Sequence, residues 1–139
     1  IVRETGDEKT EWKTDQRYAD LIYQLQEKMI QKLVQEGIGI ETNPSSNYLI
    51  GTIQKYDEHP ILRFNSRKLK DVSKNMSLHV SMNTDDQGVF DTLLENEYAL
   101  MTMALKKAKD ENHQPLYDIE DIYEWIDYVR KMGVEQVFV

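Results

Sequence analysis

The sequence of 139 residues is 40% hydrophobic and 30% charged, and its formal net charge is −8. A chain of this length can bury a core large enough for one domain. The negative charge argues against nucleic acid and anionic membranes as partners, because lysine- and arginine-rich surfaces bind both. The absence of cysteine excludes disulfides and thiolate zinc sites, and it is compatible with a cytoplasmic protein. No apolar run approaches the roughly 18 residues that a membrane-spanning helix needs.

Residues 1–14 are dense in charge and lack apolar periodicity, so we expect a mobile leader or linker there. Residues 15–139 are expected to form the folded segment. From Asp15 onward, apolar residues recur at spacings of three and four, which predicts a helix of about twenty residues. Gly37 stands where a left-handed C-cap would end it. The apolar residues that line one face of this helix are Tyr18, Leu21, Ile22, Leu25, Met29 and Leu33.

Two short apolar runs predict strands. The run IGIET, residues 38–42, fits a buried strand, and LHVSM, residues 78–82, alternates apolar and polar side chains. The segment NPSSN, residues 43–47, consists of turn-forming residues and follows the first run. Residues 48–75 are open between a loop and one or two short helices, with Pro60 in a first helical turn.

Two further helices are predicted after the second strand. Thr92 and Glu95 have the spacing of a capping box, and a helix with an apolar face follows them. Residues 117–133 form the other helix, with acidic residues at its front and basic residues at its back, which suits the helix dipole. Gly133 is the expected stop of this helix.

Aromatic residues of the last predicted helix point in different directions. Tyr123, Trp125 and Tyr128 cannot all face inward at helical spacing. Trp125 or Tyr128 is therefore expected on a second surface, against another layer of the same protein or against a partner.

The order of these elements indicates an α/β fold. Two short strands joined by a helical connection are expected to pair in parallel, because an antiparallel partner could follow through a short turn. In parallel sheets of this kind, ligands bind at the carboxyl ends of the strands. The polar loops TNPSSN, residues 42–47, and NTDDQG, residues 83–88, are therefore expected at one end of the sheet.

Asp85 and Asp86 are the first candidates for a functional site. Adjacent carboxylates raise each other's pKa unless a cation or hydrogen-bond donors compensate the charge. One of the two can bind zinc or another divalent ion while its neighbour binds a substrate. The same residues also fit an Asx turn followed by a helix N-cap, and NPSSN also fits an ordinary turn. From the residues alone, both interpretations stay open.

The three histidines, His59, His79 and His113, do not have the spacing of metal ligands, because the sequence contains neither His-x-His nor His-x-x-x-His. Each is expected at the surface or at a helix start.

Three stretches in the middle of the chain form a specific pattern when they are taken together. The stretch GIGIETNPSSNYLIGT is followed by HPILRF and then by LHVSMNTDDQGVFDTLLENEY. This order resembles the C-terminal part of the adenosine deaminase family of metal-dependent amidohydrolases. That family has a strand leading into a Pro-Ser-Ser-Asn-like turn, a His-Pro helix start, a strand ending in Ser-Leu-Asn-Thr-Asp-Asp-Pro, and a helix with Glu-Tyr. The resemblance runs from about Gln24 to Leu105.

The resemblance implies a (β/α)8 TIM-type barrel in which the two predicted strands are the seventh and the eighth. Asp85 matches the carboxylate that ligates the catalytic zinc and contacts the attacking water. Asp86 matches the carboxylate that hydrogen-bonds an imidazole nitrogen of the purine. Ser45, Ser46 and Asn47 would lie at the rim of the barrel mouth, without individual roles.

Other parts of the family's site have no match in this sequence. The family places a His-x-His pair, a later zinc-binding His, a general-acid Glu and another His before the Pro-Ser-Ser-Asn strand, yet no His precedes His59. Gln87 replaces the usual Pro, and the ending MGVEQVFV differs from the family's ending, which suggests a divergent branch. A full barrel takes roughly 250 residues. We therefore expect a C-terminal fragment of an adenosine-deaminase-like hydrolase that is inactive alone.

The parent enzyme implied by the resemblance deaminates a purine nucleoside or nucleotide and has zinc as its cofactor. The alternative is a non-catalytic or degenerate barrel-derived module that serves oligomerisation or partner binding. Open strand edges of an incomplete barrel invite strand pairing, and a homo-oligomer would be the result.

Overall fold

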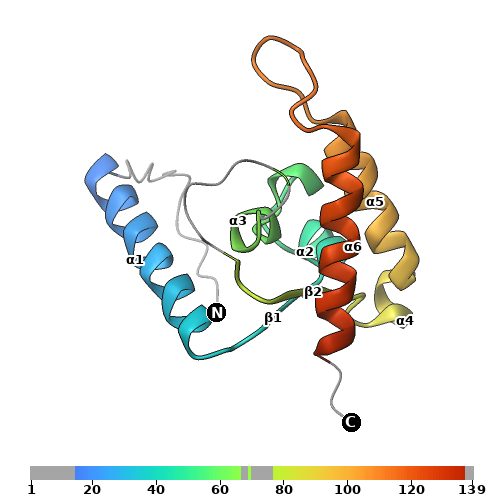
Figure 1. The fold of residues 1–139 in the computed structure, drawn as a ribbon, viewed down its shortest axis with the longest axis horizontal. Helices are drawn as coiled ribbons and strands as arrows, with labels where there is room; N and C mark the ends of the chain where they lie inside the picture. Colours follow the sequence, from blue (N-terminus) through green and yellow to red (C-terminus); the bar gives the residue numbers. More distant parts are fainter. Residues whose placement is uncertain (1–14, 67–68, 70–76, 137–139) are drawn as a thin grey trace, which may run out of the picture.

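The computed structural model describes residues 15–66, 69 and 77–136. These residues form an α/β fold with two parallel strands, six α-helices and one 3-10 helix. The predicted leader, residues 1–14, lies outside the described residues. None of the described helices is long and apolar enough to cross a membrane. In chain order (Figure 1) the elements are α1 (Gln16–Gln35), β1 (Ile40–Thr42), α2 (Pro44–Ile50), η1 (Tyr56–Glu58), α3 (Ile61–Phe64), β2 (Val80–Met82), α4 (Gln87–Phe90), α5 (Leu94–Lys107) and α6 (Ile119–Glu135).

The sheet consists of β1 and β2, which pair in parallel with Ile40 opposite Val80. A backbone hydrogen bond of 2.8 Å from Asn83 N–H to the Thr42 carbonyl extends the pairing at its carboxyl end. The parallel pairing predicted from the helical connection is confirmed. Each strand is three residues long, and the two strands are an open sheet rather than a closed barrel.

Most of the core lies between β2, α5 and α6, and Ile30 of α1 and Ile61 of α3 also belong to it. Figure 1 shows α5 and α6 side by side on one flank of the sheet, with α1 on the other flank. Burying each large apolar side chain contributes roughly 1.5–3 kcal/mol, so this flank carries most of the stabilisation from packing. The apolar side chains of α6 that are at most 3% exposed are Ile122, Trp125, Val129 and Met132.

Trp125 is fully buried against other elements of the chain, which agrees with the first of the two expected alternatives, another layer of the same protein. The indole N–H of Trp125 donates a hydrogen bond of 2.7 Å to the backbone carbonyl of Asn65, as a buried indole requires. Tyr128 is partly buried against the core. Tyr123 is the aromatic residue that faces outward, with 53% of its surface exposed.

Helix α1 begins and ends as predicted. The Asp15 side chain accepts a hydrogen bond from Arg17 N–H at the N-cap, and Gly37 has the left-handed φ of 67° that favours glycine. The apolar face, however, lies largely in solvent, because Leu25 is 52% exposed and only Ile30 of this helix is buried.

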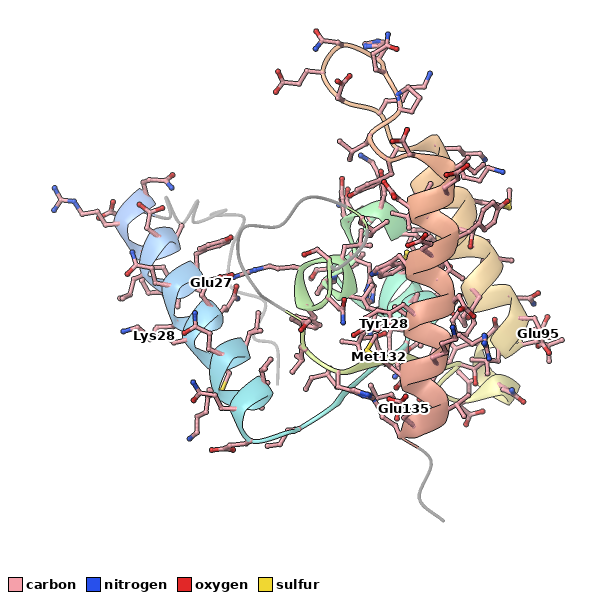
Figure 2. All side chains as sticks on the ribbon, viewed as in Figure 1. Glu27, Lys28, Glu95, Tyr128, Met132 and Glu135 are labelled. Atoms are coloured by element: carbon pink, nitrogen blue, oxygen red, sulfur yellow. The ribbon has the colours of Figure 1, made fainter. Side chains whose placement is uncertain are left out.

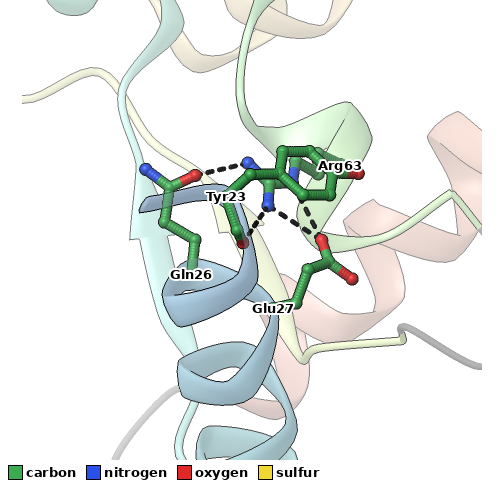
Figure 3. A network of polar contacts seen from close by, with 4 residues as sticks. All are labelled: Tyr23, Gln26, Glu27 and Arg63. Atoms are coloured by element: carbon green, nitrogen blue, oxygen red, sulfur yellow. Dashed lines mark hydrogen bonds and ion pairs between the residues drawn. The ribbon is translucent and has the colours of Figure 1, made fainter. Parts of the chain in front are cut away.

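Polar contacts attach α1 to α3 (Figure 3). Arg63 forms an ion pair of 2.8 Å with Glu27, hydrogen-bonds Gln26 and the Tyr23 carbonyl, and places its guanidinium 4.1 Å from the centre of the Tyr23 ring. Figure 2 shows Glu27 on the side of α1 that faces α3. Arg63 therefore joins a helix that has little apolar contact with the rest of the described chain.

Residues 43–47 are not a simple turn, because α2 begins at Pro44 directly after Asn43. Proline at the first helical position has a suitable φ, and its missing N–H is not needed there. Residues 48–75 could be a loop or short helices, and the described part of this segment contains η1 and α3. Pro60 directly precedes Ile61, the first residue of α3. The short helices are therefore confirmed.

The predicted capping box is wrong. Helix α5 begins after Leu93, which forms no side-chain cap, and the Thr92 hydroxyl donates instead to Glu97 at 2.7 Å. Glu95 points away from the body of the molecule (Figure 2). Thr92 is thus engaged with a buried carboxylate and is not free to cap its own helix.

Gly133 does not stop α6, which continues to Glu135 and is capped at Gln136. A Cβ atom at Gly133 would lie 3.5 Å from the Ser81 Cβ. The glycine therefore lies where α6 passes close to β2, and it keeps ordinary helical backbone angles because nothing requires a left-handed turn there.

Candidate functional site

Two polar loops meet at the carboxyl end of the sheet. The chain passes from β1 at Thr42 into α2, and from β2 at Met82 toward Asp85 and Asp86. The Ser46 hydroxyl donates a hydrogen bond of 2.8 Å to Asp85 Oδ2. This bond joins loops that are distant in sequence, and it confirms that both lie at one end of the sheet.

Asp85 has a backbone conformation that is uncommon for a residue with a side chain. Its φ is 59°, in the left-handed region, which aspartate tolerates better than most residues. A residue held in such a conformation costs on the order of 1 kcal/mol and frequently lies at a functional site. Asp85 is exposed, and Oδ1 accepts no hydrogen bond from the described residues. The Ser46 bond therefore orients a carboxylate that keeps one oxygen open.

Asp86 is the N-cap of α4. Its Oδ1 accepts hydrogen bonds from Gly88 N–H at 2.9 Å and from Val89 N–H at 3.1 Å. The N-cap interpretation of this pair therefore holds for Asp86. Both bonds end on Oδ1, so Oδ2 has no donor within the described part of the chain. The two adjacent carboxylates thus have different surroundings.

Three consecutive residues of α2 are each held by a partner from elsewhere in the chain. Ser45 N–H donates to Glu97 at 2.9 Å, and the Ser45 hydroxyl shares a hydrogen bond of 3.0 Å with the Tyr56 hydroxyl. Ser46 holds Asp85, and the Asn47 side chain pairs with a histidine described below. These bonds, together with the burial of Pro44, fix the first turn of α2 in position.

Glu97 is a fully buried carboxylate on α5. Its two oxygens accept the Ser45 N–H and the Thr92 hydroxyl at 2.9 and 2.7 Å. Burying a charge is costly unless it is hydrogen-bonded, and both oxygens are. Sequence reasoning noted only a Glu-Tyr pair here. The signal was the periodicity of α5, in which Glu97 precedes the buried Met101 and Leu105 by four and eight residues.

His59 stands at a helix start, the second of the two expected places, and it is buried there. Only 3% of its surface is exposed. Nδ1 accepts the Ile61 N–H at 3.2 Å, so Nε2 carries the proton and donates to Asn47 Oδ1 at 3.0 Å. Burial lowers the pKa of His59 to about 4, and the charge of Glu97 opposes this effect. His59 is therefore neutral near pH 7.

The other two histidines, His79 and His113, lie away from the carboxylates Asp85 and Asp86 in their hydrogen bonding: no bond joins them within the described residues. His79 is half-buried and contacts the end of α6, through Glu135 at 3.1 Å and Gln136 at 2.8 Å. His113 is exposed in the turn before α6, with a φ of 62°. The surface expectation is confirmed for His113, whereas His79 bridges the start of β2 and α6.

The described residues contain no group of three or more His, Cys, Asp or Glu side chains that could hold a metal ion. Asp85 nevertheless fits the chemistry of one zinc ligand, because zinc accepts carboxylate oxygens and Oδ1 is open. The Ser46 hydroxyl donates a hydrogen bond to the other oxygen of Asp85, and hydrogen bonds of this kind orient metal-binding side chains. The described residues thus present one oriented carboxylate, Asp85, with the Ser46 hydroxyl bound to it.

Sequence comparison with known proteins identifies a family. The sequence model of the family described as adenosine deaminase matches residues 14–116. Adenosine deaminase of Shewanella denitrificans is 32% identical over 53% of this chain, and that of Bos taurus is 35% identical over 50%. Aminodeoxyfutalosine deaminase of Streptomyces coelicolor is 32% identical over 56%. The aligned parts cover 20%, 16% and 18% of these relatives. No solved structure matches the chain significantly.

The fold and site define the class of protein as α/β, with polar residues gathered at the carboxyl end of a parallel sheet. Since the family model matches well over half of the sequence, the chain belongs to the adenosine deaminase family. The resemblance found in the motifs is therefore confirmed. The chain spans about one fifth or less of the length of the curated relatives it matches.

Proposed function

We propose that residues 15–139 are the C-terminal segment of a (β/α)8 barrel in a zinc-dependent hydrolase. The hydrolase removes the amino group of a purine nucleoside or nucleotide. Family membership supports a deaminase, and the observation that carries the site is the hydrogen bond of 2.8 Å between Ser46 and Asp85. That bond places an oriented carboxylate at the end of the sheet where parallel α/β proteins bind their ligands.

In this proposal the two carboxylates have separate roles. Asp85 contributes the open Oδ1 as a metal ligand, with Ser46 orienting it through Oδ2. Asp86 binds the purine through Oδ2, while its Oδ1 caps α4 and fixes the side chain. Zinc, when bound, supplies Lewis-acid activation of water. Holding the substrate in the reactive geometry is the contribution of Asp86.

The remaining metal ligands and the proton-transfer groups would come from parts of the protein other than this chain. The sequence has no His-x-His pair, and zinc in hydrolases takes three protein ligands as a rule. This chain alone is therefore expected to be inactive, and the full-length protein is the proper object of a test.

The test is an isosteric replacement of each carboxylate in the full-length protein, with adenosine as the probe substrate. Asp85→Asn is expected to lose bound zinc and to lower the rate of inosine formation by more than the roughly 10–100-fold typical of outer-shell changes. Asp86→Asn is expected to raise KM and lower kcat while zinc stays bound. Asp91→Asn is the matched control, because Asp91 is also exposed and also has a left-handed φ, of 47°.

Metal analysis measures the zinc content of each variant, and steady-state kinetics measures its kcat and KM for adenosine. An Asp85→Asn protein with normal zinc content and normal turnover would exclude Asp85 as a ligand. Equal effects of Asp85→Asn and Asp91→Asn would exclude a specific role as well.

A second candidate is a non-catalytic, barrel-derived module that associates with a second copy. The exposed apolar side chains of α1 favour it, because Tyr18, Leu25 and Met29 are 60%, 52% and 56% exposed. Light scattering of the full-length protein distinguishes the candidates. A stable dimer without zinc or turnover supports the module, whereas a zinc-loaded, active protein of any oligomeric state contradicts it.

A further inference from the structure

Glu97 is a buried carboxylate at a position where the pattern of its own helix favours an apolar residue. Its side chain is 0% exposed and follows the helical spacing of the apolar residues Met101 and Leu105. The ion pairs of the described residues do not include it. An apolar residue of similar size would pack at this position without the desolvation cost of a buried carboxylate. What the carboxylate provides is therefore the pair of hydrogen bonds that it accepts.

One of these bonds supplies a missing cap of α2. Asn43, the N-cap residue of that helix, forms no side-chain cap, and Pro44 has no N–H. Ser45 therefore has the first N–H of the helix, and it donates to Glu97 Oε2 at 2.9 Å. Negative charge at this end of a helix is favourable. Thr92 holds the other oxygen at 2.7 Å, so the carboxylate cannot rotate freely.

The next residue of α2 carries the link to the site. Ser46 follows Ser45 directly, and its hydroxyl donates to Asp85 Oδ2 at 2.8 Å. A shift of the first turn of α2 would therefore move the donor away from Asp85. The left-handed backbone of Asp85 gives its loop little support of its own, because strained backbone persists only where the surroundings hold it.

We propose that Glu97 is a positioning residue for Asp85. By accepting the Ser45 N–H, it fixes the first turn of α2 and with it the Ser46 hydroxyl that orients the Asp85 carboxylate. This inference rests on the proposed function only in its effect on zinc and turnover. The mechanical link from Glu97 to Asp85 is a property of the chain itself.

Three replacements in the full-length protein test the link. Glu97→Ala removes both hydrogen bonds. Glu97→Asp keeps the charge but shortens the side chain by one methylene, so it withdraws from Ser45. Glu97→Gln keeps an oxygen for the Ser45 N–H and presents an amide donor to Thr92. Met101→Ala is the matched control, because Met101 is also fully buried and lies one helical turn further along the same face.

The first readout is hydrogen exchange, which needs neither zinc nor activity. Glu97→Ala and Glu97→Asp are expected to accelerate exchange at the amides of α2 and of residues 83–86, while α6 stays protected. Glu97→Gln is expected to restore the protection. Met101→Ala is expected to accelerate exchange in α5 and α6 rather than in α2. The same exchange pattern for Met101→Ala and the Glu97 variants would overturn the proposal.

The second readout is zinc retention and turnover. Glu97→Ala is expected to lower kcat by about 10–100-fold, with KM changed less, and to release zinc faster to a chelator. Glu97→Gln is expected within about threefold of the wild type, and Met101→Ala should keep kcat despite a comparable loss of stability. If Glu97→Ala does not fold, zinc retention and kcat of Glu97→Asp test the positioning role instead.

These experiments distinguish a failure of the proposed function from a failure of the positioning role of Glu97. A wild-type protein that binds no zinc and converts no adenosine would refute the proposed function, while hydrogen exchange would still decide the link. Normal zinc retention and kcat in Glu97→Asp, in an active wild-type background, would refute the positioning role alone.

Discussion

The two long helices near the ends of the described chain, α1 and α6, are both amphipathic, yet they are used differently. Helix α6 has 17 residues and buries four of them, whereas α1 has 20 residues and buries only Ile30. Figure 1 shows α6 beside α5 and the sheet, and α1 on the opposite side. An apolar stripe predicts that a helix has a face to bury, but it does not tell which part of a protein covers that face.

The attachments of the two helices also differ in kind. Helix α6 is held by apolar burial, at roughly 1.5–3 kcal/mol for each large side chain. Helix α1 is held by one buried apolar side chain, Ile30, and by the contacts of Arg63 with Glu27, Gln26 and Tyr23 (Figure 3). Ion pairs near the surface contribute about 1 kcal/mol or less. We therefore expect α6 to unfold with the core and α1 to detach more easily.

The largest predicted effect tests the α6 side of this comparison. Trp125→Ala is expected to lower the free energy of unfolding by about 3–5 kcal/mol, because it empties a buried site and removes the hydrogen bond from the indole N–H to the Asn65 carbonyl. Urea unfolding of the full-length protein measures this. Tyr123→Ala, on the exposed side of the same helix, is expected to cost less than about 1 kcal/mol. Equal costs would contradict the described orientation of α6.

A smaller effect, dependent on pH, tests the buried histidine of the site. The pKa of His59 is lowered from 6.5 to about 4, so between these values the unfolded chain binds a proton that the folded chain does not. Stability therefore falls as the pH drops from about 6.5 to about 4, and the fall then levels off. At pH 5 the expected loss is about 2 kcal/mol, at 1.36 kcal/mol for each unit of pKa difference.

The replacement His59→Gln removes the titrating group and keeps a polar side chain beside Asn47. The loss of stability between pH 7 and pH 5 is expected to be smaller in this variant by about 2 kcal/mol. Comparing each protein with itself at the two pH values cancels the cost of the altered hydrogen bonds. Parallel pH curves for the wild type and the variant would show that His59 is not kept neutral by the fold.

Much of the fold could be predicted from periodicity and order. The helix from Gln16, both strands and their parallel pairing follow from local pattern and from the length of the connection. The predictions that are wrong concern residues that contact a part of the chain distant in sequence instead of the neighbouring residues that local patterns consider. Thr92 bonds to Glu97 instead of capping α5, and Gly133 packs beside Ser81 instead of ending α6.

The site could be predicted only in part, for a similar reason. Adjacent carboxylates after a strand are visible in a sequence, as Asp85 and Asp86 were. The roles of Ser46 and Glu97 depend on contacts across 39 and 52 residues, which no local pattern encodes. Assignment of Asp85 to zinc and Asp86 to the purine came from the family resemblance and stays a prediction.

The smallest predicted effect tests the α1 side of the comparison. In the described arrangement Leu25 is 52% exposed and Ile30 is 4% exposed. Leu25→Ala is therefore expected to change the free energy of unfolding by less than about 0.5 kcal/mol. Ile30→Ala is expected to cost about 2–5 kcal/mol, because it leaves a cavity between α1 and the core. Urea unfolding of both variants of the full-length protein measures the difference.

A cost for Leu25→Ala as large as that for Ile30→Ala would break the contrast between α1 and α6. Large-to-small replacements cost several kcal/mol only where the side chain is enclosed, so such a result would require a cover over the α1 face. Repeating the measurement at several protein concentrations would then identify the cover. A cost that rises with concentration indicates a second copy, whereas a constant cost indicates residues of the same protein.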